Sequence, residues 1–193
     1  MKNLIKITMG LLAAAMVASC SPYGEHHVAV CGGKEVKIID MAKSDGETLH
    51  EVWSWCIEDP TEGLPAEYAE YLNPLDECKF VDGNSKLLLT SSTSAVVLID
   101  LKTKKNLFYA RVPMAHSADL LPGDRVAVAL STHKLGNSLE IYDIAQPEKV
   151  LWRDSRVTAR CGTPSARAFM RWAMMFCVST SSRIGRAIPP RLN

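Results

Sequence analysis

Residues 80–100 read FVDGNSKLLLTSSTSAVVLID, and this stretch decides the fold. Residues 86–90 form an apolar run typical of a β-strand, which is followed by a turn of small polar residues. A second apolar run follows the turn and closes on Asp100. The Asp-Gly pair at 82–83 is a hairpin signal, so a further strand is expected just before the first run. The stretch therefore predicts antiparallel strands joined by tight turns.

The same pattern occurs twice more in the chain. Residues 28–40 and 125–143 each contain two β-rich runs around a small-residue turn, with a short insertion in the later copy, and each closes on an Asp. The last two closing Asp residues, Asp100 and Asp143, lie 43 positions apart. Every closing Asp is followed by a polar turn and another apolar run, and the second and third units are also preceded by a strand. Those flanking runs are residues 51–55, 107–112 and 149–152 after the units, and 78–84 and 117–124 before them. Each unit is thus expected to be a small antiparallel sheet of four strands.

Such a sheet cannot bury both of its faces alone, and radial packing of several sheets around an axis solves this problem in β-propellers. Residues 80–103 resemble the YVTN and WD40-like propeller repeats, and the resemblance extends over about residues 27–155. It implies a propeller but says little about function. A β-sandwich of similar meanders is the alternative. Propellers typically close with about four to eight blades. The sequence holds parts of three, so we expect an all-β, partial β-propeller over residues 28–155, with an N-terminal signal helix and an irregular tail.

The N-terminus reads as a targeting segment. A basic start is followed by an apolar stretch at residues 7–17 that is too short for a spanning helix. It ends in Val-Ala-Ser-Cys at residues 17–20, which resembles the lipobox of bacterial lipoproteins. The resemblance implies a signal peptide at 1–20, acylation of Cys20 with chains such as palmitate, and a tether at 21–27. It also implies a lipid-anchored protein of the cell envelope, at the outer membrane or cell surface rather than the inner membrane, because Ser21 replaces the retention Asp. The alternative is an ordinary signal peptide with an incidental Cys.

The charge pattern changes abruptly near Ser155. Residues 1–155 contain all 21 acidic residues and 15 of the 22 basic ones, whereas residues 156–193 contain seven Arg and no Lys, Asp or Glu. Codons rebuilt across the boundaries of the tail codons are compatible with further strands and turns. We therefore expect residues 156–193 to be a frameshift product without a native fold, which truncates the propeller near residue 155. The alternative is an Arg-rich arm for anionic lipid or nucleic acid. Because the Arg residues are scattered without an amphipathic face, no nucleic-acid partner is expected.

The cysteines of the body predict one disulfide. Disulfides are allowed outside the cytoplasm. Cys56 and Cys78 flank a loop-like insertion and are the expected pair, whereas Cys31 lies in a strand pattern and is expected to be a buried thiol. The sequence has no CxxC motif and no His residues at ligand spacing, so neither a metal nor another cofactor is expected.

The candidate binding residues lie in loops that feed the inner strands. Residues 56–77 and 113–117 are expected on one face of the propeller, and long loops on rigid sheets often carry function. The candidates for ligand contact are Trp55, Glu58, Asp59, His116 and Ser117. Two of them have plainer interpretations: Trp55 could pack between blades together with Trp53, and His116 could bond a backbone carbonyl.

Two functions remain open from the sequence. The first is a lipid-anchored extracytoplasmic propeller that binds a ligand or protein, with a glycan as one candidate, present here as an incomplete and inactive fragment. The second is a propeller hydrolase or lyase that uses His and carboxylates of the central channel. Because the chain has no Ser nucleophile motif, P-loop or dinucleotide fingerprint, the sequence leans away from an enzyme.

Overall fold

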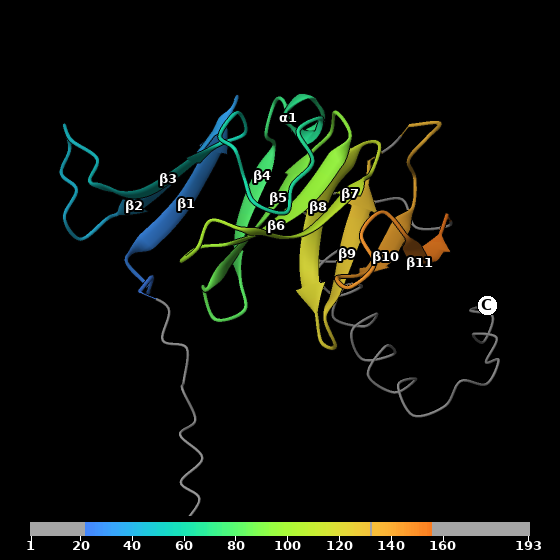
Figure 1. The fold of residues 1–193 in the computed structure, drawn as a ribbon. Helices are drawn as coiled ribbons and strands as arrows, with labels where there is room; N and C mark the ends of the chain where they lie inside the picture. The colour runs from blue at the N-terminus through green and yellow to red at the C-terminus, as the bar shows by residue number, and fades with distance from the viewer. Residues whose placement is uncertain (1–21, 132, 156–193) are drawn as a thin grey trace, which may run out of the picture.

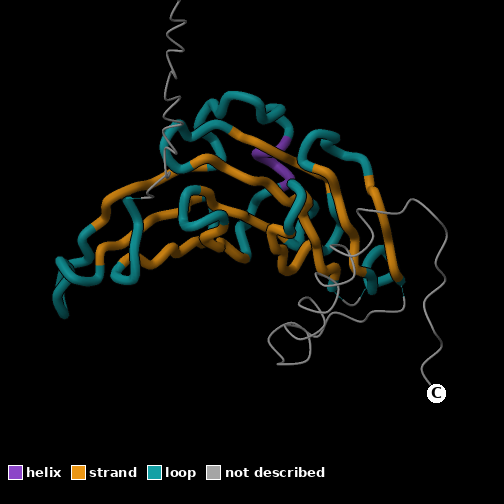
Figure 2. The backbone as a smooth tube through the Cα atoms, turned by 90° about the horizontal axis from the view of Figure 1, so that it is seen from below, coloured by secondary structure: helices purple, strands orange, loops and turns teal. Residues whose placement is uncertain are grey.

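The protein folds into three antiparallel β-sheets that stand side by side (Figure 1). The structure is a computed structural model that describes residues 22–131 and 133–155. Seen from below, the described chain forms an arch with strands along its length (Figure 2). This architecture confirms the predicted all-β, partial β-propeller.

Strands that are neighbours in the sequence are neighbours in each sheet. Sheet I contains β1 (His27–Gly32), β2 (Glu35–Asp40) and β3 (Glu51–Cys56). Sheet II contains β4 (Glu77–Val81), β5 (Lys86–Ser91), β6 (Ala95–Asp100) and β7 (Asn106–Arg111). Sheet III contains β8 (Ala115–Leu121), β9 (Arg125–Leu130), β10 (Leu139–Asp143) and β11 (Val150–Asp154). The helix α1 (Tyr68–Tyr71) lies in the insertion between sheets I and II and is shorter than the helix expected at 65–72.

The repeated closing Asp has a structural role in every sheet. Its carboxylate accepts a hydrogen bond from a backbone N–H of the turn that follows, which fixes the start of that turn. The three bonds are Ala42 N–H to Asp40 (3.0 Å), Thr103 N–H to Asp100 (2.7 Å) and Ala145 N–H to Asp143 (2.9 Å). The repeat seen in the sequence is therefore a repeat of turn chemistry as well as of strands.

The Asp-Gly signal marks a left-handed turn between β4 and β5. Asp82, Gly83 and Asn84 have φ angles of 51°, 60° and 63°. Asn, Asp and Gly adopt this backbone region with the least strain, so the hairpin needs residues of this kind.

The core lies in the two seams between the sheets. Leu87, Leu89 and Val97 of sheet II pack toward sheet I, whereas Leu88 and Val96 pack toward sheet III. Because both faces of sheet II are covered, β5 and β6 read as unbroken apolar runs rather than as alternating ones. Burial on both faces is what packing of blades demands of a middle blade.

Sheet I has one strand fewer than its neighbours. β1 corresponds in the repeat to β5 and β9, so among the described residues sheet I has no counterpart of β4 and β8. Val28 and Val30 of β1 are each 44% exposed. Successive side chains of a strand alternate between faces, so Ala29 and Cys31 turn toward the core instead.

The segment expected as a tether is packed at its C-terminal end. The Tyr23 ring stacks on Phe80 at 6.0 Å between centroids, and its carbonyl accepts a hydrogen bond from Asn84. His27 already belongs to β1. The expected signal peptide, Cys20 and the Arg-rich tail lie outside the described residues. Within the part that the structure describes, no helix is long and apolar enough to span a membrane.

Candidate functional site

The two loops predicted to share one face contact the same turn. The Thr93 hydroxyl, in the β5–β6 turn, donates a hydrogen bond to the Asn73 carbonyl at 3.0 Å. On its other side, the Met114 N–H donates to the Ser92 carbonyl at 3.2 Å. The ends of both loops therefore flank the β5–β6 turn, at the end of the sheets where β4 and β8 begin. We call this the entry end.

His116 is placed at the entry end by a β-bulge. The register of β8 against β9 steps from Ala115 opposite Leu130 to Ser117 opposite Ala129, which leaves His116 as the extra residue. A bulge bends its strand and re-aims the side chain at that point. The His116 side chain is exposed, and its carbonyl accepts a hydrogen bond from the Thr90 hydroxyl at 3.4 Å.

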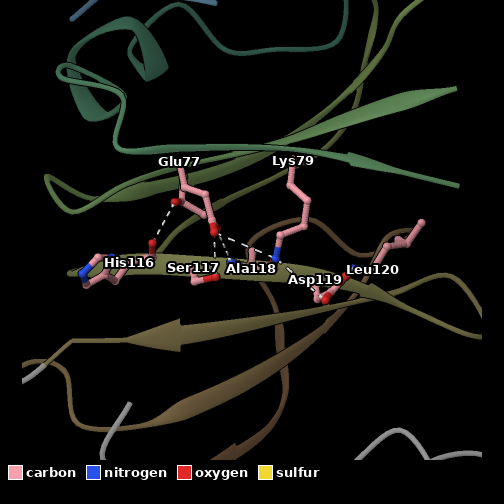
Figure 3. Close-up of polar contacts among 8 residues, drawn as sticks. Glu77, Lys79, His116, Ser117, Ala118, Asp119 and Leu120 are labelled. Carbon is pink, nitrogen blue, oxygen red and sulfur yellow. Dashed lines mark hydrogen bonds and ion pairs between the residues drawn. The ribbon is translucent and has the colours of Figure 1, made fainter. Parts of the chain in front are cut away.

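Ser117, the next residue, is held from sheet II by Glu77 (Figure 3). The Ser117 hydroxyl donates to the Glu77 carboxylate at 3.1 Å, and the Ala118 N–H donates to its second oxygen at 3.2 Å. Lys79, two positions along β4, donates from its ammonium group to the Ala118 carbonyl at 2.7 Å. Its nitrogen also lies 3.8 Å from a carboxylate oxygen of Asp119. We call Glu77, Lys79, Ser117 and Asp119 the β4–β8 clamp.

The clamp limits the chemistry available to its members. Glu77 accepts hydrogen bonds with both oxygens and lies 3.9 Å from the Lys79 ammonium, so its negative charge is already compensated. The Ser117 hydroxyl donates to a carboxylate rather than to an imidazole, which differs from the pairing that activates a serine nucleophile. The arrangement fixes the backbone around His116 and supports recognition rather than catalysis.

Sequence reasoning missed Glu77 and Lys79. Their signal was the i, i+2 spacing of charges in β4, matched by Ser117 and Asp119 at the same spacing in β8. That spacing puts each pair on one face of its strand, but the sequence does not show that the two faces meet.

Glu58 and Asp59 belong to a different place. Glu58 pairs with Lys34 of the β1–β2 turn at 2.5 Å, and the Asp59 carboxylate accepts from the Cys56 N–H at 3.1 Å. Both contacts lie within sheet I and its following turn, whereas His116 and Ser117 lie at the seam of sheets II and III. The structure therefore does not gather the five sequence candidates into one site.

The assignment of Trp55 as a ligand-binding residue is wrong. Its side chain is only 2% exposed, and its indole N–H donates to the Thr61 hydroxyl at 2.8 Å. Trp53 is also buried and donates to the Leu101 carbonyl at 3.0 Å. Both rings pack in the seam between sheets I and II, which was the plainer interpretation.

The expected Cys56–Cys78 disulfide is not formed, since Cys31, Cys56 and Cys78 are all free thiols. Cys56 ends β3, on the far side of β2 from β1, whereas Cys78 lies on β4 and is hydrogen-bonded to Cys31 of β1. That hydrogen bond lowers the pKa of Cys31, and it raises the pKa of Cys78 together with burial. Cys31 is half-buried rather than fully enclosed.

The described residues hold no group of three His, Cys, Asp or Glu side chains arranged for a metal ion. No curated protein matches the sequence. Among solved structures, the chain is similar to BamB from Moraxella catarrhalis, with 16% identity over 71% of this chain and 37% of that chain, and a TM-score of 0.47. It is also similar to a chain of a mitotic checkpoint complex, with 9% identity over 69% of this chain and 38% of that chain, and a TM-score of 0.44. The protein thus spans well under half the length of either structure. Residues 29–146, more than half of the chain, match one family, and the protein belongs to that family of unknown function, DUF6528.

Proposed function

We propose that this protein is a lipid-anchored β-propeller of the cell envelope that binds a protein partner at its entry end. The observation that carries the proposal is the bulge that exposes His116 directly beside the β4–β8 clamp. A side chain displayed from a rigid strand loses little conformational freedom on binding, which favours recognition.

A protein partner is favoured over a glycan because Trp55 is buried. Aromatic rings that stack on sugars must be accessible, and the glycan alternative depended on this ring. The enzyme alternative is not favoured either, because the Glu77 carboxylate is committed to Ser117 and Ala118.

The binding proposal is tested with a photo-crosslinking residue placed at position 116 of the full chain in cells. Position 102, an exposed Lys in the β6–β7 turn at the opposite end of sheet II, is the matched control. We expect a discrete protein adduct from position 116 that is absent from position 102. Adducts of equal yield from both positions, or from neither, would contradict the proposal.

Membrane attachment rests on Cys20 and its lipobox context. We expect Cys20→Ala to abolish incorporation of labelled palmitate and to move the protein out of the membrane fraction. Cys56→Ala is the matched control and should retain both. An unchanged membrane fraction for Cys20→Ala would contradict lipid anchoring.

We further propose that residues 156–193 are translated out of frame, on the basis of their seven Arg and missing acidic residues. The nucleotide sequence through codon 193 tests this directly. A shifted frame that continues with strand and turn patterns supports it, and an early stop in that frame contradicts it. A chain with the frame restored should then bind the partner more tightly than the present chain.

A further inference from the structure

The strand β4 presents different residues to its two neighbours. Glu77 and Lys79 face β8 of sheet III, as the clamp shows. Cys78 and Phe80 alternate with them and pack into the cluster shared with sheet I. Cys78 therefore lies in the seam between sheets I and II.

β1 supplies the opposite wall of that seam. Its side chains alternate, so that Val28 and Val30 are exposed while Ala29 and Cys31 pack against the same cluster as Cys78. β1 and β4 are in direct contact. The two thiols are hydrogen-bonded to one another, so they already lie next to each other while both are reduced.

We propose that Cys31 and Cys78 form a disulfide that joins sheet I to sheet II. The inference rests on the envelope location proposed above, because a stable disulfide needs an oxidising compartment. The third described thiol, Cys56, lies on β3 and is separated from β1 by β2, so it does not compete for Cys78.

The reaction is an exchange with a protein or small-molecule disulfide as oxidant. The Cys31 thiolate attacks one sulfur of the oxidant, which breaks the oxidant S–S bond and leaves a mixed disulfide on Cys31. Cys78 then loses its proton to solvent, attacks the Cys31 sulfur and releases the second oxidant thiol. Two protein thiols and one disulfide become one protein disulfide and two thiols, so atoms and electrons balance.

The order of the two steps follows from the local environment. The hydrogen bond from Cys78 lowers the pKa of Cys31, which favours Cys31 as the thiolate that attacks first. Cys78 is more buried and remains a thiol until the Cys31 sulfur is activated.

The bridge has a mechanical role that the topology explains. Sheets II and III meet through β4, β5 and β8, whereas sheet I has no strand inside β1 and meets sheet II along β1 and β4. A covalent bond at this contact would stop β1 from separating from β4, which is the way an unclosed sheet would detach.

The pairing is tested in vitro on the full chain. The purified, reduced protein is incubated with oxidised glutathione, remaining thiols are alkylated, and the unreduced digest is analysed by mass spectrometry. We expect a peptide pair that joins Cys31 to Cys78. Cys56→Ala should retain this pair, and Cys78→Ala should leave Cys31 as a glutathione adduct.

Bridging of Cys78 to Cys56, or separate glutathione adducts on Cys31 and Cys78 of the wild-type protein, would overturn the proposal. These outcomes do not bear on where the protein resides. Thiol trapping in cells provides the distinction: a bridge that forms in vitro while both thiols remain reduced in cells retains the pairing and contradicts the envelope location.

Discussion

The Ser117 hydroxyl donates a hydrogen bond to the Glu77 carboxylate across 3.1 Å, and this contact joins the first strand of sheet III to the first strand of sheet II. The same carboxylate accepts from the Ala118 N–H, so one side chain fixes both the side chain and the backbone of β8 beside the bulge. The position of His116 thus depends on a residue of the neighbouring sheet.

Glu77→Ala should destabilise the protein by about 1–3 kcal/mol, because it leaves the Ala118 N–H and the Ser117 hydroxyl without their acceptor. Urea unfolding followed by circular dichroism measures the loss. Glu58→Ala is the matched control, since its ion pair with Lys34 lies at the surface and should matter much less. Equal losses for the two variants would show that the clamp has no special weight.

Trp55→Ala should cost about 3–5 kcal/mol, because it empties a large volume in the seam between sheets I and II. Trp152→Ala removes an equally large ring from β11, where the side chain is 45% exposed, and should cost less than about 1 kcal/mol. The midpoints of urea denaturation compare the two. A larger loss for Trp152→Ala would contradict the burial pattern.

Tyr68→Phe should destabilise the protein by about 1–2 kcal/mol. The Tyr68 hydroxyl on α1 donates to Glu148 in the β10–β11 turn, and the second Glu148 oxygen accepts from the Arg111 N–H at 2.9 Å. The inserted helix is thereby attached to sheet III. Tyr71→Phe keeps the ring that lies against Arg111 and serves as the control. If both variants unfold at the wild-type midpoint, the attachment contributes nothing.

Acid should weaken sheet I. The Lys43 ammonium, hydrogen-bonded to Asp40, holds the pKa of that carboxyl below its ordinary value, and the N–H groups of Glu47 and Thr48 do the same for Asp45. A lowered folded-state pKa gives stability that is present above the unfolded-state pKa of about 3.9 and is lost as the pH falls through the folded-state value.

Thermal unfolding at neutral pH and below pH 4 measures this loss. Asp40→Asn should be less stable than the wild type at neutral pH and should lose less on acidification. Parallel pH profiles for the two proteins would contradict a role for Asp40.

The sequence was sufficient for the strands because their signals are local. Runs such as Leu87–Leu89, turns with Asp-Gly and the closing Asp residues each act within a few positions, so the order of strands and the propeller architecture could be predicted. The contacts between sheets could not, because they depend on which faces meet. Cys78 was paired with Cys56 on the basis of the loop between them, whereas the packing of β1 against β4 sets Cys31 beside it.

The same limit explains the mixed outcome at the candidate site. His116 was expected at the start of an inner strand and is exposed there through the bulge. Trp55 has the same aromatic character whether it is displayed or buried, and only the position of the neighbouring sheet determines that it is enclosed.

The alternation along β4 makes the length of the chain before it critical. Glu77 and Lys79 face a polar neighbour while Cys78 and Phe80 face an apolar seam. A deletion or insertion of one residue between α1 and β4 that shifted the strand by one position would exchange these two sets. Carboxylate and ammonium groups would then enter the apolar seam, and a thiol and a phenyl ring would face Ser117. The connection from Asn73 to Asp76 should therefore tolerate substitutions far better than changes in length.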